Sequence, residues 1–173
     1  MKVLKILLQA LGILVLVLAV AIVTLRIEHR SADGPSILFP GGAFVTGEIY
    51  SGPEPDWRFT DDIPVIELQT DEPLSSRRTF IMESNGRIYV PSGYMRSFLG
   101  RLWKDWAFQA AEGDGYGAIR INGVRYPRRL VRITDGPELD GVVAKMRQKY
   151  GPVTREAIDS GDVWIFELAP REG

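Results

Sequence analysis

The chain has 173 residues, 45% of them hydrophobic, which is enough for one globular domain and an accessory segment. A formal net charge of −1 gives no reason to expect nucleic acid as a partner. Because the chain has no cysteine and one histidine, His29, the composition excludes thiolate catalysis and cysteine-based metal sites and argues against a Ser-His-Asp triad. We therefore predict no metal site.

An apolar segment from Ile6 to Leu25 is the first predicted element. At ~1.5 Å per residue, its roughly twenty residues match the ~30 Å hydrocarbon core of a bilayer. We interpret residues 1–30 as an uncleaved membrane anchor whose partner is the lipid bilayer. A cleaved signal peptide is the alternative, since Ala19-Val20-Ala21 has the small-x-small form of a cleavage site, but the apolar run continues beyond it.

The basic residues that flank this segment predict its orientation. Lys2 and Lys5 precede it and Arg26 and Arg30 follow it, so each side has two basic side chains. The charged amino terminus adds one more positive charge to the N-terminal side. This count favours a cytoplasmic N-terminus. The rest of the chain is then expected on the non-cytoplasmic side of a single-pass membrane protein.

Two regions follow the anchor. Glycine and proline pairs punctuate residues 31–55, which we interpret as a linker with a first short strand at Phe44–Tyr50. Residues 56–173 are the predicted main domain. The charge is uneven, because residues 48–72 carry eight acids and one arginine whereas residues 120–132 carry five arginines and no acid. We expect these arginines to lie on a solvated face of a sheet.

Two Asn-Gly pairs, Asn85-Gly86 and Asn122-Gly123, each lie between β-rich runs. Both central residues of a type I′ turn need φ > 0, which this pair tolerates better than almost any other. The first pair is flanked by Thr79–Glu83 and Arg87–Val90, and the second lies in a similar run that continues to Tyr126. Two hairpins separated by one helical segment predict a small antiparallel barrel.

The other predicted elements follow from hydrophobic periodicity. Val65–Thr70 alternates with a period of two and is a predicted half-buried strand. Ser97–Glu112 has apolar residues at helical spacing, so we predict one helix with Ser97 as N-cap and with Trp103 and Trp106 packed on the barrel. The remaining predicted elements are a strand at Arg129–Thr134, a helix opened by Asp135–Glu138 and ended by Gly151, a short helix at Thr154–Asp159 and a strand at Val163–Leu168.

Three stretches, Arg78–Met82, Gly86–Gly93 and Ala118–Tyr126, carry a family resemblance. Together they resemble the flavin-binding split β-barrel of the pyridoxamine 5′-phosphate oxidase-like superfamily, over about Val65–Tyr150. The resemblance implies a mainly β fold with flanking helices, of the α+β class: an antiparallel split β-barrel, preceded here by one transmembrane helix. Many barrels of this type are homodimers with sites between the subunits, so the resemblance also implies a homodimer.

The same resemblance implies a ligand site. In the superfamily, an arginine before the hairpin, a hydroxyl after it and basic residues near the next helix hold the flavin phosphate, and the matching positions here are Arg78, Thr79, Ser92 and Lys104. A phosphate dianion needs such convergent cationic and hydroxyl donors. The implied cofactor is flavin mononucleotide (FMN) or a related flavin. Tyr94–Arg101 departs from the family pattern, because it lacks the Ser-Arg-Lys cluster of the better-known oxidases.

Two interpretations of function stay open. In the first, the chain is a membrane-anchored barrel that binds an anionic cofactor or ligand and acts as a flavin-dependent oxidoreductase. In the second, a non-enzymatic envelope protein or a subunit of a membrane complex uses the barrel to bind a partner. The candidate residues also have structural interpretations: Arg77 and Arg78 can pair with Asp71 or Glu72 in solvent, and Ser92 can simply end a strand.

Overall fold

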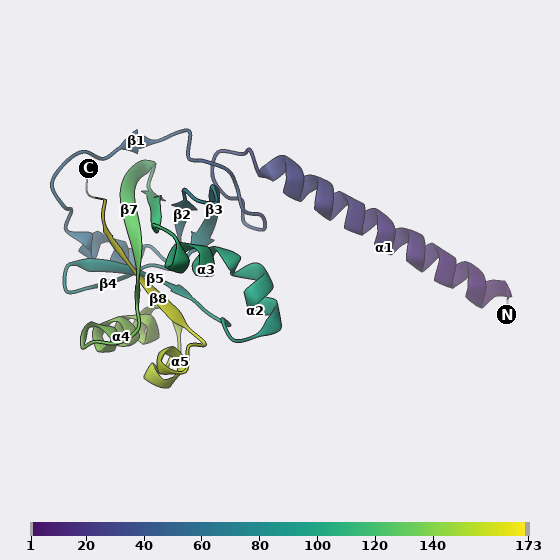
Figure 1. The fold of residues 1–173 in the computed structure, drawn as a ribbon. Helices are drawn as coiled ribbons and strands as arrows, with labels where there is room; N and C mark the ends of the chain where they lie inside the picture. Colours follow the sequence, from purple (N-terminus) through teal and green to yellow (C-terminus); the bar gives the residue numbers. More distant parts are fainter. Residues whose placement is uncertain (1, 172–173) are drawn as a thin grey trace.

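A computed structural model describes residues 2–171, without the side chains of Leu99 and Leu102, and shows one long helix that projects from a curled sheet (Figure 1). The helix, α1 (Lys2–His29), has no buried side chain. It is long and apolar enough to span a membrane, a property that an N-terminal signal sequence shares. The predicted apolar segment is therefore part of one continuous helix, whose N-terminal end lies far from the sheet (Figure 1).

Eight strands form one sheet, in the order β3-β2-β6-β7-β8-β5-β4, with β1 paired to β7 outside this path. Neighbours along the path are antiparallel, whereas β1 pairs with β7 in parallel. The sheet curls into a half-barrel with flanking helices, which confirms the mainly antiparallel fold of the α+β class (Figure 1). The strands are β1 (Glu48–Ile49), β2 (Ile66–Thr70), β3 (Ser75–Thr79), β4 (Met82–Ser84), β5 (Arg87–Ser92), β6 (Tyr116–Ile121), β7 (Val124–Ile133) and β8 (Trp164–Pro170).

Two hydrophobic clusters hold the helices on the sheet. The larger cluster fills the inside of the half-barrel and includes Trp57, Leu68 and Phe166, all almost completely buried. The smaller one joins α4 to β4 and β5, with Leu139 against Tyr89. The helices other than α1 are the 3-10 helix η1 (Trp57–Asp62), α2 (Phe98–Trp103), α3 (Asp105–Glu112), α4 (Glu138–Tyr150) and α5 (Arg155–Asp159).

The two predicted hairpin turns are confirmed. Asn85 and Gly86 join β4 to β5 with φ angles of 54° and 76°, and Asn122 and Gly123 join β6 to β7 with φ angles of 50° and 79°. These left-handed values are the ones that a type I′ turn requires at its two central positions. The alternation predicted for β2 is also confirmed, because the side chains of Ile66, Leu68 and Thr70 are buried.

The strand predicted at Thr79–Glu83 is formed only in part, because residues 80 and 81 lie outside any strand, and β3 (Ser75–Thr79) was not predicted from the sequence. β3 ends at Thr79 and β4 begins at Met82, with a bend at Phe80 and Ile81. At the bend, the Tyr150 hydroxyl donates to the Ile81 carbonyl oxygen at 2.7 Å and accepts from the Ile81 amide at 3.1 Å. The last residue of α4 thus replaces the sheet hydrogen bonds that Ile81 lacks, as a buried backbone group requires.

The helix predicted at Ser97–Glu112 is in fact two helices, which is a correction. Ser97 is the N-cap as predicted, since its Oγ accepts from the Gly100 amide at 2.8 Å. At Lys104, however, the backbone leaves helical geometry (φ −112°, ψ 22°) and starts α3. The two halves therefore face different surroundings: Trp106 on α3 is buried in the larger cluster, whereas Trp103 on α2 is 67% exposed.

Three of the five arginines of the β6–β7 hairpin, Arg120, Arg125 and Arg128, hold the linker against the sheet, whereas Arg129 and Arg132 are exposed as expected. Arg128 is only 3% exposed, lies 4.7 Å from the Trp57 ring centroid and binds the Glu54 carboxylate at 2.9 Å. Arg120 contacts the carboxylates of Glu67 and Asp33. Hydrogen bonds at Asp33, foremost that of Thr46, lower the pKa of its carboxyl. The strand predicted at Phe44–Tyr50 shortens to the two residues of β1.

Candidate functional site

A cleft of about 820 Å³ opens at the seam of the half-barrel, where the ends of β3 and β5 diverge. The bend after β3 contributes Phe80 to its wall, and the turn after β5 contributes Tyr94. Residues of α4, of α5 and of the chain before β8 close the far side. This volume lies in the range of small-molecule and cofactor sites, about 300–1,000 Å³.

Three of the four predicted site residues line this cleft. Arg78 and Thr79 are the last residues of β3, and Lys104 lies at the corner between α2 and α3. The fourth, Ser92, is wrong as a cleft residue: its side chain is fully buried, and its hydroxyl lies 3.2 Å from the Met95 sulfur. Because side chains alternate along a strand, the hydroxyl of Ser92 turns into the core whereas its neighbour Pro91 lines the cleft.

Lys104 holds a positive charge at the wall of the cleft without a counter-ion. It forms no ion pair and no side-chain hydrogen bond among the residues that the structure describes. Burial lowers the pKa of its ammonium group, and the positive charge of Arg77 lowers this pKa further. An ammonium in these surroundings is stabilised by any anion that enters the cleft.

Arg77 is the functional candidate that the sequence analysis missed. Its guanidinium lies 4.9 Å from the Trp106 ring centroid, inside the half-barrel. The Nε atom is buried with no hydrogen-bond partner, and the other contact of the group is a long one, 3.4 Å, to Thr70 Oγ1. Burial lowers the pKa of Arg77 to about 10, so the group is charged at neutral pH.

The solvated ion pairs expected for Arg77 and Arg78 are not formed. Asp71 instead binds Arg171 at 2.9 Å. Arg78 lies opposite Glu67 in the β2–β3 register, but the Glu67 carboxylate is engaged by Arg120. The orientation of the two arginines is set by the register of β3, which places Arg77 on the face toward the core and Arg78 on the exposed face. The sequence Ser-Ser-Arg-Arg-Thr contains no local pattern that indicates this register, so the sequence analysis could not identify Arg77.

Aromatic rings form another wall of the cleft. Phe80 is 46% exposed and stacks one face on Tyr150, with ring centroids 4.3 Å apart. Tyr94 is held in the left-handed region at φ 62°, which is uncommon for a residue other than glycine. Its carbonyl accepts from both the amide and the hydroxyl of Ser97, at 3.1 and 2.9 Å. The chain therefore keeps two accessible rings beside the cations.

This combination fits a ligand that carries both an anionic group and a planar apolar part. Arg78, Lys104 and Thr79 offer donors for an anion, and Phe80 offers a ring face for stacking. The lining also includes one acid, Asp162, so the cleft carries a negative charge as well as the positive charges of Arg78 and Lys104. Within residues 2–171 no group of three or more His, Asp or Glu side chains is placed to hold a metal ion.

Comparison with known proteins adds no relative on which a function can be based. No known protein family, no curated protein and no solved structure matches this chain.

Proposed function

We propose that this chain is a membrane-anchored half-barrel domain that binds an anionic ligand in the seam cleft, with FMN as the first candidate. The observation that carries the proposal is the pair Arg77 and Lys104. Lys104 lines the cleft, the partly buried Arg77 is near enough for its charge to lower the pKa of Lys104, and neither forms an ion pair in the described part of the chain. Such an arrangement is costly for an empty fold and favourable once an anion binds.

The residues present fit a flavin. A phosphate at Arg78, Thr79 and Lys104 gains charge-assisted hydrogen bonds, each worth about 1.5–3 kcal/mol. Arg77 does not line the cleft, but its charge acts on Lys104 and adds a positive potential there. The exposed face of Phe80 suits a planar ring system, and the cleft volume of about 820 Å³ accommodates a ligand of this size.

The membrane part of the proposal rests on α1. Its twenty-eight residues make a helix without a single buried side chain, so its apolar surface has no partner inside the protein. A bilayer is the environment in which such a helix, apolar on all sides, is stable. A retained anchor predicts that the mature protein keeps residues 1–30 in the membrane fraction. Mass analysis that finds a soluble chain beginning near Ile22 would instead support a cleaved signal sequence.

We further propose that the domain is a flavin-dependent oxidoreductase. A bound flavin would supply the redox chemistry, while the chain would supply binding and orientation. The alternative is a non-enzymatic envelope protein or a subunit of a membrane complex, in which the cleft receives part of a partner. A homodimer is proposed with either function, because the family that the sequence resembles places its sites between subunits.

Titration of the detergent-solubilised full-length protein with FMN tests the proposal. We expect quenching of flavin fluorescence on binding, and an affinity at least about tenfold weaker, or 1.4 kcal/mol, for Arg78→Ala. Arg87→Ala is the matched control, because Arg87 is also an exposed strand arginine but pairs with Glu167 away from the cleft. The control should bind like the parent.

The result that overturns the flavin proposal is equally direct. No binding by the parent protein at about 100 µM FMN, a level at which even a Kd near 1 mM is detectable, would leave the partner-binding alternative in front. An absorption spectrum of the purified protein, followed by mass analysis of released small molecules, identifies any ligand that is carried through purification.

A further inference from the structure

Outside α1, the four most exposed large apolar side chains lie on two segments, the linker loop that follows α1 and the start of α2 with the turn before it. In the described chain the four most exposed are Ile37 (82%), Phe98 (80%), Leu38 (79%) and Tyr94 (73%). Trp103, on the same short helix as Phe98, is 67% exposed. Ile37 and Tyr94 line the same cleft, so the linker loop and the start of α2 are neighbours. We call these five side chains the apolar rim.

The fold fixes α2 so that Phe98 and Trp103 point outward. Gly100 packs against the turn before the helix so closely that an added Cβ would lie 1.7 Å from the Tyr94 carbonyl oxygen. The Ser97 cap fixes the start of the helix on the same turn. With Gly100 buried, Phe98 and Trp103 are left on the outside. The backbone position of α2 therefore determines the exposure of Phe98 and Trp103.

The apolar rim lies at the level where α1 becomes polar. The Arg26 guanidinium lies 5.9 Å from the Trp103 ring centroid, which links the last turns of α1 to α2. Arg26 is the first charged residue after the apolar run that ends at Leu25. In Figure 1, α2 lies on the side of the sheet from which α1 projects. If α1 crosses a bilayer, α2 lies at the boundary between hydrocarbon and headgroups.

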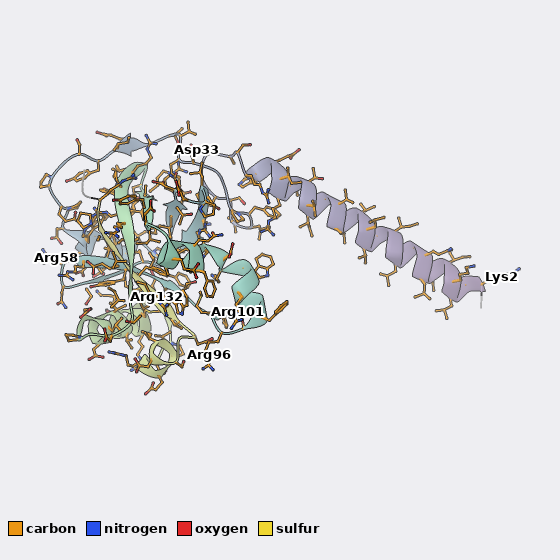
Figure 2. All side chains as sticks on the ribbon, viewed as in Figure 1. Lys2, Asp33, Arg58, Arg96, Arg101 and Arg132 are labelled. Carbon is orange, nitrogen blue, oxygen red and sulfur yellow. The ribbon has the colours of Figure 1, made fainter. Side chains whose placement is uncertain are left out.

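Basic residues surround the apolar rim. Arg26 lies in the last turn of α1 and Arg30 directly follows the helix, while Arg96 and Arg101 lie before and on α2, where Figure 2 labels them. All four are exposed and form no ion pair within the described residues. Glu28 and Asp105 are the acids nearest in sequence. Tryptophan, tyrosine and arginine are the residues that favour the membrane interface, and arginines attract anionic lipid headgroups.

We propose that the apolar rim rests in the headgroup region of the bilayer that α1 crosses, so that the domain lies on the membrane surface with the mouth of its cleft toward the lipid. This inference rests on the proposed insertion of α1. A bilayer is favoured over a protein partner because the apolar rim has five side chains, whereas a stable protein interface takes about 20–30 residues a side.

Single-cysteine labelling of the full-length chain tests the inference, since the chain has no native cysteine. Spin labels are placed at Phe98→Cys and Leu38→Cys on the apolar rim, at Leu16→Cys within α1, and at Arg58→Cys as a control. Arg58 is exposed and lies on the side of the domain away from α1 (Figure 2). Each variant is reconstituted into vesicles of phosphatidylcholine and phosphatidylglycerol, and collision rates with oxygen and with a water-soluble nickel complex are compared.

We expect the labels at positions 98, 38 and 16 to collide mainly with oxygen, which concentrates in lipid, and the label at position 58 to collide mainly with the nickel complex. If the label at position 98 or 38 behaves like that at position 58 while the label at position 16 reports lipid, the docking inference is wrong and the anchor stands. If the label at position 16 also reports water, the anchor proposal fails, and the docking inference with it.

Discussion

Two groups of cationic side chains in this domain differ in whether they contact carboxylates. On the β6–β7 hairpin, Arg120 and Arg128 contact carboxylates of Asp33, Glu67 and Glu54 that the linker and β2 bring to them. At the open seam, Arg77 and Lys104 contact no carboxylate within the described residues, although both are partly buried. Both arginines of the first group have carboxylate partners, although the Nε atom of Arg128, like that of Arg77, is buried without a hydrogen-bond partner among the described residues.

The difference indicates which cations serve the structure and which are free for a ligand. A buried charge that already has its partner gains little from an added anion, and its removal leaves the partner unpaired. A buried charge without a partner gains much from an added anion, and its removal relieves the fold. Charge content alone does not separate the two groups, because the arginine-rich stretch is the one whose Arg120 and Arg128 already have carboxylate partners.

The largest effect is expected from breaking the paired group. Arg128→Ala removes the ion pair with Glu54 and the stacking on Trp57, and leaves a cavity, so the free energy of unfolding should fall by about 2–4 kcal/mol. Urea unfolding of the detergent-solubilised protein, followed by tryptophan fluorescence, measures the change. Arg58→Ala is the control, since Arg58 and Asp56 form an exposed pair that should contribute little. Equal effects of the two variants would contradict the structural role.

The turn that carries the paired group gives the next effect. Gly123→Val should lower the free energy of unfolding by roughly 1–2 kcal/mol, because a β-branched residue resists φ > 0. Crowding plays no part, since no atom lies within 4 Å of an added Cβ. Gly123→Asn should retain most of the stability, because asparagine tolerates the left-handed region. If both variants unfold at the same urea concentration, the φ requirement is not the cause.

Removal of an unpaired cation should lower the affinity for FMN without lowering the free energy of unfolding. Arg77→Met keeps an apolar stem on Trp106 but removes the charge, so stability should stay the same or rise, while FMN affinity falls by about tenfold. Calorimetric titration and urea unfolding of the same variant give both values. A variant that binds FMN normally but unfolds more easily would assign Arg77 to the fold, as with Arg128.

The smallest effect is a pH dependence of binding. Burial and the charge of Arg77 hold the pKa of Lys104 below 10.5, so the folded protein loses this proton at a lower pH than the unfolded chain does. FMN affinity should fall a few-fold as the pH rises toward 10.5, because Lys104 then loses its positive charge. The charge of the ligand does not change in this window, since a phosphate ester is already a dianion above its second pKa of ~6. Over the same window the stability of the unliganded protein should rise, because the unfolded state binds more protons.

Lys104→Gln is the matched variant for this measurement. It lacks the titrating group, so its affinity for FMN should be weaker at neutral pH and should change less between neutral pH and 10.5. Fluorescence titrations across the pH series compare the two proteins. An identical pH profile for parent and variant would place the titration elsewhere in the molecule.

Elements that depend on local interactions were predictable from the sequence. The turns at Asn85-Gly86 and Asn122-Gly123, the alternation in β2 and the cap at Ser97 each follow from a few neighbouring residues. Three of the four predicted site residues, Arg78, Thr79 and Lys104, line one cleft. The two hairpins predicted a small antiparallel barrel, and the structure shows an antiparallel sheet that curls into a half-barrel.

What the sequence determined by itself was therefore the two hairpin turns, most of the strands and helices and the apolar length of α1, because propensity and periodicity act over a few residues; β3 and η1 were not predicted. Tertiary structure decided which arginine of Arg77-Arg78 turns inward, that Ser92 faces the core, and that the helix breaks at Lys104. Each of these depends on strand register or on packing between distant segments, and a shift of one residue in register exchanges the two faces of a strand. The partners of Arg120 and Arg128 likewise come from more than fifty residues away in the chain, so only the folded protein shows which cations are already paired.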